Sequence, residues 1–157
     1  MDIGSGNAYP SNSLSNFAPH PFIIDGIECN SMEGFLQSLK FKSEDMQKEV
    51  CKLVGYAAKK KGKKKNWQRT QTLYWRGKEI KRNSQEYQDL LDRAYTQMYE
   101  NTKFKKALSS TGNAVLTHSI GRSKIFETVL TKSEFCSRLT KLRDYGTLKD
   151  IKQRKLL

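Results

Sequence analysis

Residues 31–41 read SMEGFLQSLKF, and no other stretch of the chain is as informative. Its apolar side chains recur at intervals of three and four, a spacing that predicts a helix with one face turned to the core. Three polar side chains occupy positions i, i+4 and i+7 of this helix and share one stripe, formed by Glu33, Gln37 and Lys40. A polar stripe beside a core face predicts either the wall of a pocket or a solvated ridge, and the spacing alone leaves both interpretations open.

The segment before this helix has the pattern of a β-hairpin. Residues 22–29 read FIIDGIEC, in which two short apolar runs flank Asp25-Gly26. Gly supports the positive φ that a tight hairpin turn requires. Ser31 then follows as the predicted N-cap of the helix that carries Glu33, since its hydroxyl can accept from a free N–H of the first turn.

The second half of the chain is predicted to contain three helices, over residues 84–100, 103–109 and 132–145. In the first, apolar residues recur every three or four positions, and Asn83 or Ser84 can cap it. In the last, Ser133 is the predicted N-cap, but Glu134 stands too early to complete a capping box. An aromatic, hairpin-like piece precedes these helices at residues 72–80. The expected fold is a single compact α+β domain, predominantly helical, with a few short strands.

Length and charge limit the class of protein. At 157 residues the chain has the size of one domain, with a core expected over about 12–145 and a basic tail over about 146–157. Lys and Arg total 29 against 16 Asp and Glu, a net charge of +13, and residues 59–65 hold six lysines. Such a surface attracts polyanions such as nucleic acid and makes their binding salt-dependent. The same lysines could instead hold the phosphate of a small ligand.

Other patterns point to a cytoplasmic protein without a metal or cofactor. The chain has no run of about eighteen apolar residues, and its N-terminus lacks the pattern of a signal peptide, so we expect neither secretion nor membrane contact. The three cysteines, Cys29, Cys51 and Cys136, lie far apart and lack the spacing of a zinc site. Their odd number also argues against a disulfide framework.

Several short motifs follow one another in the order of a known family. SNF at 15–17, PFIIDG at 21–26 and the stretch at 31–41 resemble segments of the YbiA-like, or NADAR, family. The segment GYAAKKKG at 55–62, the pair Asn66-Trp67 and the KF…L…TG pattern at 103–112 resemble later ones. The resemblance covers about residues 12–126, and an ordered series is far more specific than any single motif.

Members of this family are N-glycosidases that act on nucleotides related to NAD and ADP-ribose. Some cleave the bond between ribose and a pyrimidine in riboflavin-pathway intermediates, and others remove ADP-ribose from guanine in nucleic acid. Both reactions build positive charge on the anomeric carbon, which a carboxylate can stabilise. The resemblance therefore implies Glu33 as the catalytic carboxylate and an ADP-ribose-like or phosphoribosyl nucleotide as substrate, with nucleic acid as a further candidate partner.

The resemblance also implies a set of residues that contact the substrate, namely Asn16, Phe17, Gln37, Lys40, Lys59, Trp67, Trp75 and Arg122. The two lysines would hold phosphate, the asparagine would hydrogen-bond the sugar or the base, and an aromatic ring would stack on the base. Three of them have structural alternatives. Asn16 could cap a turn, Phe17 could anchor the core, and Trp67 could pack against the neighbouring helix.

The chain departs from the family at one segment. Many members carry an L.E pattern followed by an Asp and a WG pair, whereas residues 116–122 read LTHSIGR and place His118 where the Glu would be. A His can donate and accept near neutral pH, but it cannot supply a permanent negative charge. His118 is therefore either the second catalytic residue or a structural one, and Glu127 is another candidate for that group. A non-catalytic module that binds ADP-ribose or nucleic acid remains the alternative to an enzyme.

Overall fold

The informative stretch folds as a short helix that is capped where the sequence predicts. Ser31 is the N-cap of α2 (Met32–Ser38), and its hydroxyl accepts a hydrogen bond of 3.0 Å from the Gly34 N–H. The helix is shorter than predicted, so Lys40 lies beyond its end. The turn continues, however, because the Lys40 N–H donates to the Gln37 carbonyl at 3.2 Å. The three polar side chains of the stripe therefore stay together.

The computed structural model describes residues 1–150, in which the elements are α1 (Ser11–Leu14), β1 (Phe22–Ile24), β2 (Ile27–Cys29), α2, α3 (Glu44–Cys51), α4 (Gly55–Lys63), β3 (Thr72–Trp75), β4 (Lys78–Lys81), α5 (Gln85–Met98), α6 (Thr102–Ser109) and α7 (Lys132–Tyr145). They form one predominantly helical α+β domain with two small antiparallel hairpins, which confirms the predicted fold class. Residues 151–157, the greater part of the predicted basic tail, lie outside the described residues. Within residues 1–150, no helix combines the length and the apolar character needed to cross a membrane.

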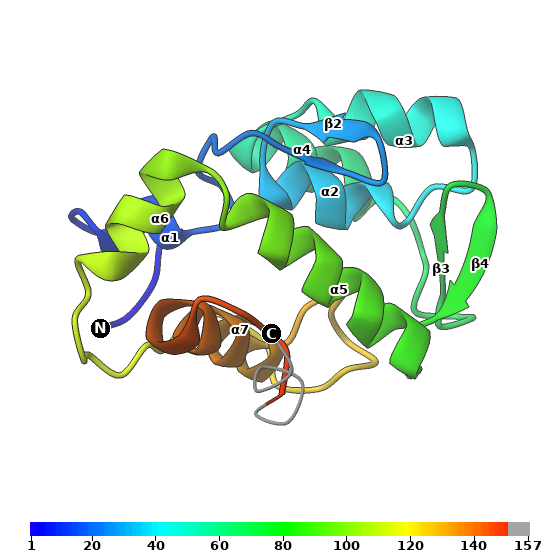
Figure 1. Cartoon of the computed structure of the whole chain (residues 1–157). Helices are drawn as coiled ribbons and strands as arrows, with labels where there is room; N and C mark the ends of the chain where they lie inside the picture. The colour runs from blue at the N-terminus through cyan, green and yellow to red at the C-terminus, as the bar shows by residue number, and fades with distance from the viewer. Residues whose placement is uncertain (151–157) are drawn as a thin grey trace.

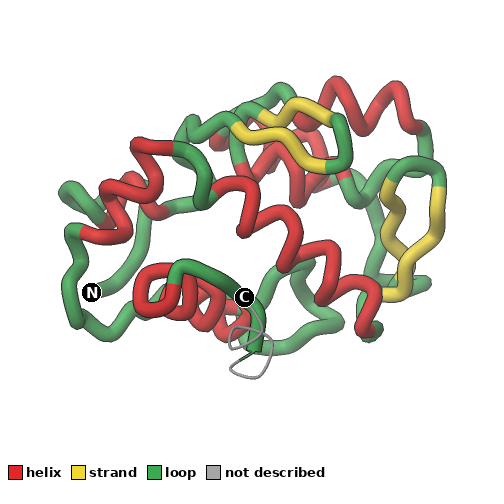
Figure 2. Tube along the Cα trace, in the orientation of Figure 1, coloured by secondary structure: helices red, strands yellow, loops and turns green. Residues whose placement is uncertain are grey.

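Helix α5 runs through the middle of the molecule and separates two groups of elements (Figure 1). Helices α2, α3 and α4 and the β1–β2 hairpin lie on one side, and α7 with the loop before it lies on the other. Figure 2 shows the strands confined to two small hairpins at the edge of this helical body. The buried face of α5 has the spacing that the sequence predicts, with Tyr87, Leu90, Leu91, Ala94, Tyr95 and Met98.

Both hairpins are closed by two-residue turns. Asp25 and Gly26 have φ of 49° and 80° in the first, and Arg76 and Gly77 have φ of 53° and 83° in the second. Positive φ at both central residues matches the right-handed twist of the flanking strands. The hairpin predicted at residues 22–29 is confirmed as β1 paired with β2.

Two local predictions differ from the structure. Helix α7 spans the predicted residues, but its N-cap is Thr131 rather than Ser133. The Thr131 hydroxyl accepts from the Glu134 N–H at 3.1 Å and the Glu134 carboxylate accepts from the Thr131 N–H at 2.8 Å, so the capping box is complete. Helix α3 was not predicted, because the polar Gln47 occupies its buried face and interrupts the apolar period.

The N-terminal residues lie beside the distant segment 114–130, which contains no helix or strand of its own. Asp2 forms an isolated parallel bridge with Thr117, and the Asp2 carboxylate accepts from the Ser119 N–H at 2.7 Å and its hydroxyl at 2.6 Å. These hydrogen bonds hold the pKa of Asp2 below its ordinary value. A contact between residues that are far apart in sequence thus fixes the segment that carries His118.

Candidate functional site

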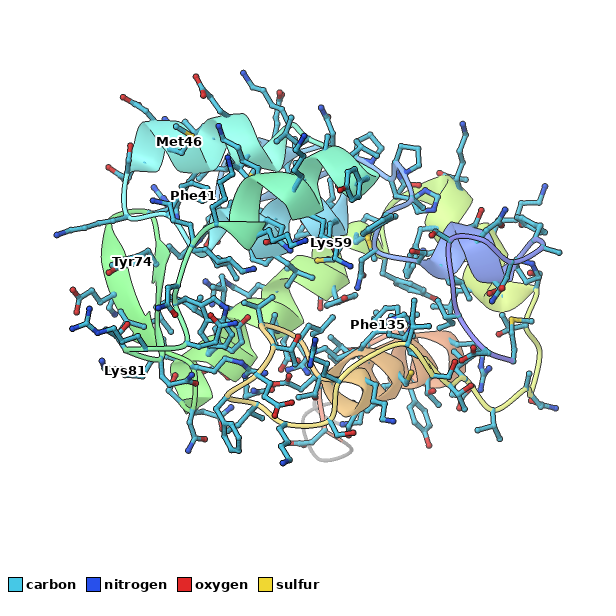
Figure 3. The ribbon with its side chains drawn as sticks, turned by 180° about the vertical axis from the view of Figure 1, so that it is seen from behind. Phe41, Met46, Lys59, Tyr74, Lys81 and Phe135 are labelled. Atoms are coloured by element: carbon cyan, nitrogen blue, oxygen red, sulfur yellow. The ribbon has the colours of Figure 1, made fainter. Side chains whose placement is uncertain are left out.

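A cavity of about 360 Å³ lies between the α2–α4 side of the molecule and the segment before α7. This volume is within the range typical of small-ligand sites. Figure 3 views the molecule from behind, with Lys59 on α4 and Phe135 on α7, both of which line the cavity. Nine of the ten residues predicted from the sequence also line it, namely Asn16, Phe17, Glu33, Gln37, Lys40, Lys59, Trp67, His118 and Arg122.

Trp75 is the exception, and it has a structural role instead. Its indole Nε1 donates to Asp25 Oδ2 at 2.8 Å, which ties the second hairpin to the turn of the first. Its ring packs edge-on against Phe35 with the centroids 5.1 Å apart, and only 4% of the residue is exposed. Because its N–H is used and its faces are packed in the core, the predicted contact of Trp75 with a substrate is not supported.

Glu33 is half-buried in the wall of the cavity and is held by its neighbours. Gln37 Nε2 donates to Glu33 Oε1 at 2.9 Å, and the Glu33 N–H donates to the Asn16 carbonyl at 2.9 Å. Burial raises the pKa of Glu33 above its ordinary value, while the Gln37 hydrogen bond and the charges of Lys59 and Lys40 act in the opposite direction. The carboxylate therefore meets few solvent dipoles and two nearby cations.

Gln37 keeps its position because α4 passes close to it. The residue is only 6% exposed, and Gly62 of α4 faces its amide. A Cβ at position 62 would lie 1.9 Å from Gln37 Oε1, so no side chain fits there without displacing the amide that holds Glu33. Gly62 thus permits the close approach of α2 and α4 on which the carboxylate's geometry depends.

The two lysines approach Glu33 from different elements. Burial lowers the pKa of Lys40. The negative charge of Glu33 opposes this decrease, and the positive charge of Lys59 adds to it. Lys59 projects from α4, where its Nζ lies 6.0 Å from the centroid of the Phe17 ring. Phe17 is half-buried and lines the cavity, and Trp67 also lines it but is only 4% exposed. This wall can hold an anionic group beside an aromatic ring.

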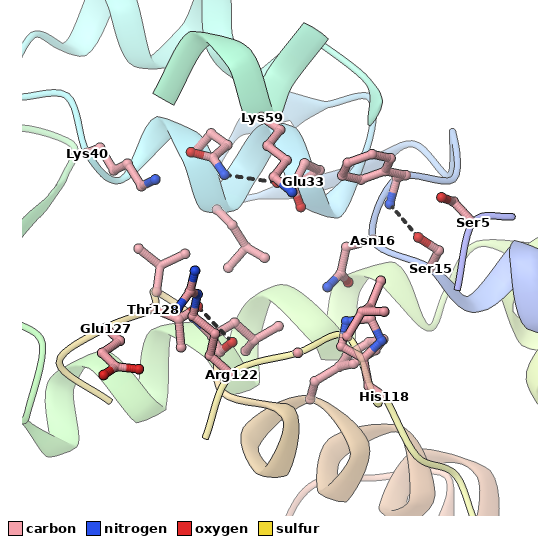
Figure 4. Close-up of a pocket in the computed structure, with 18 of the residues that line it drawn as sticks. Ser5, Ser15, Asn16, Glu33, Lys40, Lys59, His118, Arg122, Glu127 and Thr128 are labelled. Atoms are coloured by element: carbon pink, nitrogen blue, oxygen red, sulfur yellow. Dashed lines mark hydrogen bonds between the residues drawn. The ribbon is translucent and has the colours of Figure 1, made fainter. Parts of the chain in front are cut away.

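The opposite wall comes from the segment that departs from the family pattern. His118 Nδ1 donates to the Ile3 carbonyl at 2.8 Å, and the ring packs edge-on against Phe135 with the centroids 5.2 Å apart. A neutral ring held in this way has Nε2 as its acceptor nitrogen. Figure 4 shows His118 and Arg122 across the cavity from Glu33 and Lys59. The structural and the functional interpretation of His118 are thus compatible.

The sequence did not predict several other lining residues, which are Ser5, Ser15, Leu36, Gln68, Ile120, Gly121, Thr128, Val129, Leu130 and Phe135. Most lie in turns and loops, where no periodic pattern indicates which side chains point inward. Ser5 is brought to the cavity by the N-terminal contact with the segment 114–130. Glu127 also lines the cavity, but it is exposed at the rim.

The comparisons with known proteins agree with this fold. A family model described as bacteriophage protein GP30.3 matches residues 8–144. The chain belongs to this family. A relative from Enterobacteria phage T4, described as an uncharacterized 17.1 kDa protein in the Gp30-rIII intergenic region, is 39% identical over an alignment of 150 residues. The alignment covers 92% of this chain and 97% of the relative.

A solved structure shows that this GP30.3-family protein shares its fold with a bacterial protein. The NMR structure of YbiA from E. coli matches it with a TM-score of 0.58 and 18% identity, covering 98% of this chain and 84% of YbiA. The resemblance to YbiA-like proteins that the motifs indicate is therefore confirmed at the level of the fold.

Proposed function

We propose that this GP30.3-family protein is an N-glycosidase that hydrolyses the bond between a ribosyl group and a base nitrogen. The substrate would be an ADP-ribose-linked or phosphorylated ribosyl compound, such as ADP-ribose attached to guanine in nucleic acid. The observation that carries this proposal is the half-buried Glu33 carboxylate, which lines a nucleotide-sized cavity between Lys40 and Lys59. The shared fold with YbiA supports it.

The reaction places a separate demand on each wall of the cavity. As the C1′–N bond breaks, its electron pair leaves with the base and positive charge develops on the ribose C1′. The Glu33 carboxylate stabilises that charge and orients a water molecule, which adds to C1′. The proton that this water loses passes to the carboxylate or to solvent. The departing nitrogen takes up a proton, for which His118 on the opposite wall is the candidate donor in its imidazolium form, with the second proton on Nε2. Lys40, Lys59 and Arg122 bind the phosphates.

The partial burial of Glu33 favours this role. In a poorly solvated site, a fixed negative charge interacts more strongly with a developing cation than it would in water. The same burial raises the pKa of Glu33, so activity should rise with pH as this carboxyl group ionises. The positive charges of Lys40 and Lys59 limit this rise in the pKa of Glu33, and they thereby favour the ionised carboxylate.

The test uses two substrates, guanine-ADP-ribosylated DNA and a riboflavin-pathway ribosylamino-pyrimidine phosphate, with mass spectrometry of the released base and ribosyl product. We expect the wild-type protein to release a base from one of them. Glu33→Gln should lower kcat at least about 100-fold and keep the shape of the side chain. Glu49→Gln, on the exposed face of α3, is the matched control and should leave the rate unchanged.

One observation favours a second function, a module that binds ADP-ribose without cleaving it. His118 lies opposite Glu33, at the position where the YbiA-like pattern has a Glu, and the only other lining carboxylate of the described residues is the exposed Glu127. In that case ADP-ribose would raise the melting temperature, because it binds only the folded state, while neither substrate would release a base. A wild-type rate in Glu33→Gln would exclude the catalytic role of this residue.

A further inference from the structure

A buried tyrosine hydroxyl lies behind the candidate site. Tyr95 of α5 is 0% exposed, and its ring packs against Phe135 with the centroids 6.2 Å apart. Its hydroxyl donates to Asn16 Oδ1 at 2.8 Å. Burial raises the pKa of Tyr95 well above its ordinary value, so the hydroxyl keeps its proton and acts as a donor.

This hydrogen bond determines which end of the Asn16 amide faces the cavity. With Oδ1 occupied by Tyr95, the Nδ2 amino group is left as the free end, and within residues 1–150 it donates to no protein acceptor. The backbone of Asn16 is fixed as well, because its carbonyl accepts the Glu33 N–H. A fixed donor therefore faces the cavity that the Glu33 carboxylate lines, and Figure 4 shows both side chains there.

We propose that Tyr95 is a positioning residue that, through Asn16, builds a subsite for a ribose hydroxyl next to Glu33. A hydroxyl can accept from Asn16 Nδ2 and donate to the carboxylate at the same time, so the pair is complementary to it. With the amide reversed, its carbonyl and the carboxylate would present two acceptors, which a single hydroxyl cannot satisfy. The inference rests on the proposed function for the ribosyl nature of the ligand.

The proposed reaction also identifies the hydroxyl. Glu33 acts at C1′, and the ribose hydroxyl adjacent to C1′ is the 2′-OH. The Asn16–Glu33 pair therefore selects ribosyl ligands over their 2′-deoxyribosyl counterparts. Losing one partner of such a site leaves a buried polar group unpaired, which makes discrimination strong.

Tyr87 offers a matched control on the same helix. It is also 0% exposed, and its hydroxyl donates to the backbone carbonyl of Val129, a lining residue, rather than to Asn16 or Glu33. Tyr95→Phe and Tyr87→Phe each remove one buried hydroxyl and leave one acceptor unpaired, so their effects on stability should be similar. Only Tyr95→Phe should change how the protein recognises ribose.

The experiment measures by calorimetry the binding of ADP-ribose and of an analogue that lacks the 2-hydroxyl of the terminal ribose, which is the ribose that carries no adenine. All titrations are done below the melting temperature of every variant. We expect the wild-type protein to bind ADP-ribose at least about tenfold more tightly. Tyr95→Phe should reduce this ratio to about two or less, whereas Tyr87→Phe should retain it. Asn16→Asp keeps the acceptor for Tyr95 but replaces the donor by an oxygen, so it should lose the preference even if Tyr95→Phe fails to fold.

The outcomes separate this inference from the proposed function. Equal binding of the two ligands by the wild-type protein, or a preference retained in Tyr95→Phe or Asn16→Asp, would overturn the inference, and so would no binding of ADP-ribose at all. If the preference is found and lost as expected but no base is released from either substrate, the subsite stands and the N-glycosidase activity is wrong.

Discussion

At the scale of the residue, Glu33 shows how function and stability oppose each other in this protein. An ionised carboxylate that is half-buried costs free energy, and the raised pKa of Glu33 expresses this cost. Gln37 and the two lysines recover part of it, but the direction of the shift shows that burial dominates. A residue that serves only the fold would not be expected to carry this penalty.

A prediction on stability follows from the sign of that shift. Because the pKa of Glu33 is higher in the folded than in the unfolded state, the folded protein loses stability as the pH rises from about 4.5 through the folded pKa. Glu33→Gln does not ionise, so at pH 7 it should melt about 3 °C above the wild-type protein. The gain should disappear as the pH is lowered toward 4. Melting curves of both proteins across this pH range test the prediction, and a lower melting temperature of the variant at pH 7 would contradict it.

At the scale of the element, α7 and the loop before it are held to the rest of the fold by a buried ion pair. Arg82, only 1% exposed, donates to both carboxylate oxygens of Glu134, at 2.6 and 3.1 Å, and its Nε donates to the Thr128 carbonyl at 2.8 Å. Glu134 also completes the capping box of α7 with Thr131. The Arg82–Glu134 pair thus orders both the helix start and a loop that lines the cavity.

Removing one partner of this pair should be costly. Glu134→Ala leaves the Arg82 guanidinium buried without a counter-charge, so we expect a loss of about 3–5 kcal/mol in the free energy of unfolding. Glu86→Ala, which breaks the exposed pair with Lys78, is the control and should cost at most about 1 kcal/mol. Urea unfolding of the two variants measures the difference, and equal losses would mean that the buried pair contributes no more than a surface pair.

At the scale of the whole molecule, the net charge of +13 includes a group of lysines that lies beside the cavity. Of the six lysines at residues 59–65, Lys59 lines the cavity, and the others are exposed next to it along α4 and the turn that follows. A polymeric substrate could extend from the cavity over this surface, whereas a free nucleotide would not reach it. Mutations in residues 59–65 can therefore distinguish a polymeric substrate from a free nucleotide.

If the substrate is nucleic acid, reversing two of these charges should weaken its binding. Lys61→Glu with Lys64→Glu should lower kcat/KM on ADP-ribosylated DNA about tenfold at low salt and make it less dependent on salt. The same pair should leave turnover of a ribosylamino-pyrimidine phosphate unchanged. Lys48→Glu with Lys52→Glu, exposed on and just after α3, provides the control. Unchanged kinetics on DNA in the first pair would indicate that this surface does not contact the substrate.

The sequence predicted local structure better than long-range structure. The Asp25-Gly26 turn, the Ser31 cap and the apolar face of α5 depend on neighbours a few residues away, and all three were predicted correctly. The capping box at Thr131 was missed although its spacing is local, because Ser133 offered a competing cap. Trp75 shows the opposite limit, since the Asp25 carboxylate that binds its indole lies 50 residues away.

The candidate site shows the same division. The sequence brought nine residues of the cavity together without a structure. Seven of them lie in segments that resemble a known family, and His118 and Arg122 lie in the segment where the chain departs from it. Tyr95 was predicted only as a core residue of α5, which is correct but incomplete. Its hydroxyl meets Asn16 across 79 residues of sequence, and no pattern along the chain records that contact.

The contact between the N-terminus and the segment 114–130 also bears on how the protein is made. The His118 ring is held by the carbonyl of Ile3, 115 residues earlier in the chain, and Phe135 lies still further along. The chain must leave the ribosome at least as far as Phe135 before these groups can meet. A nascent chain that stops before this residue therefore offers a ligand no enclosed site, so binding reports on synthesis past Phe135 as well as on correct folding.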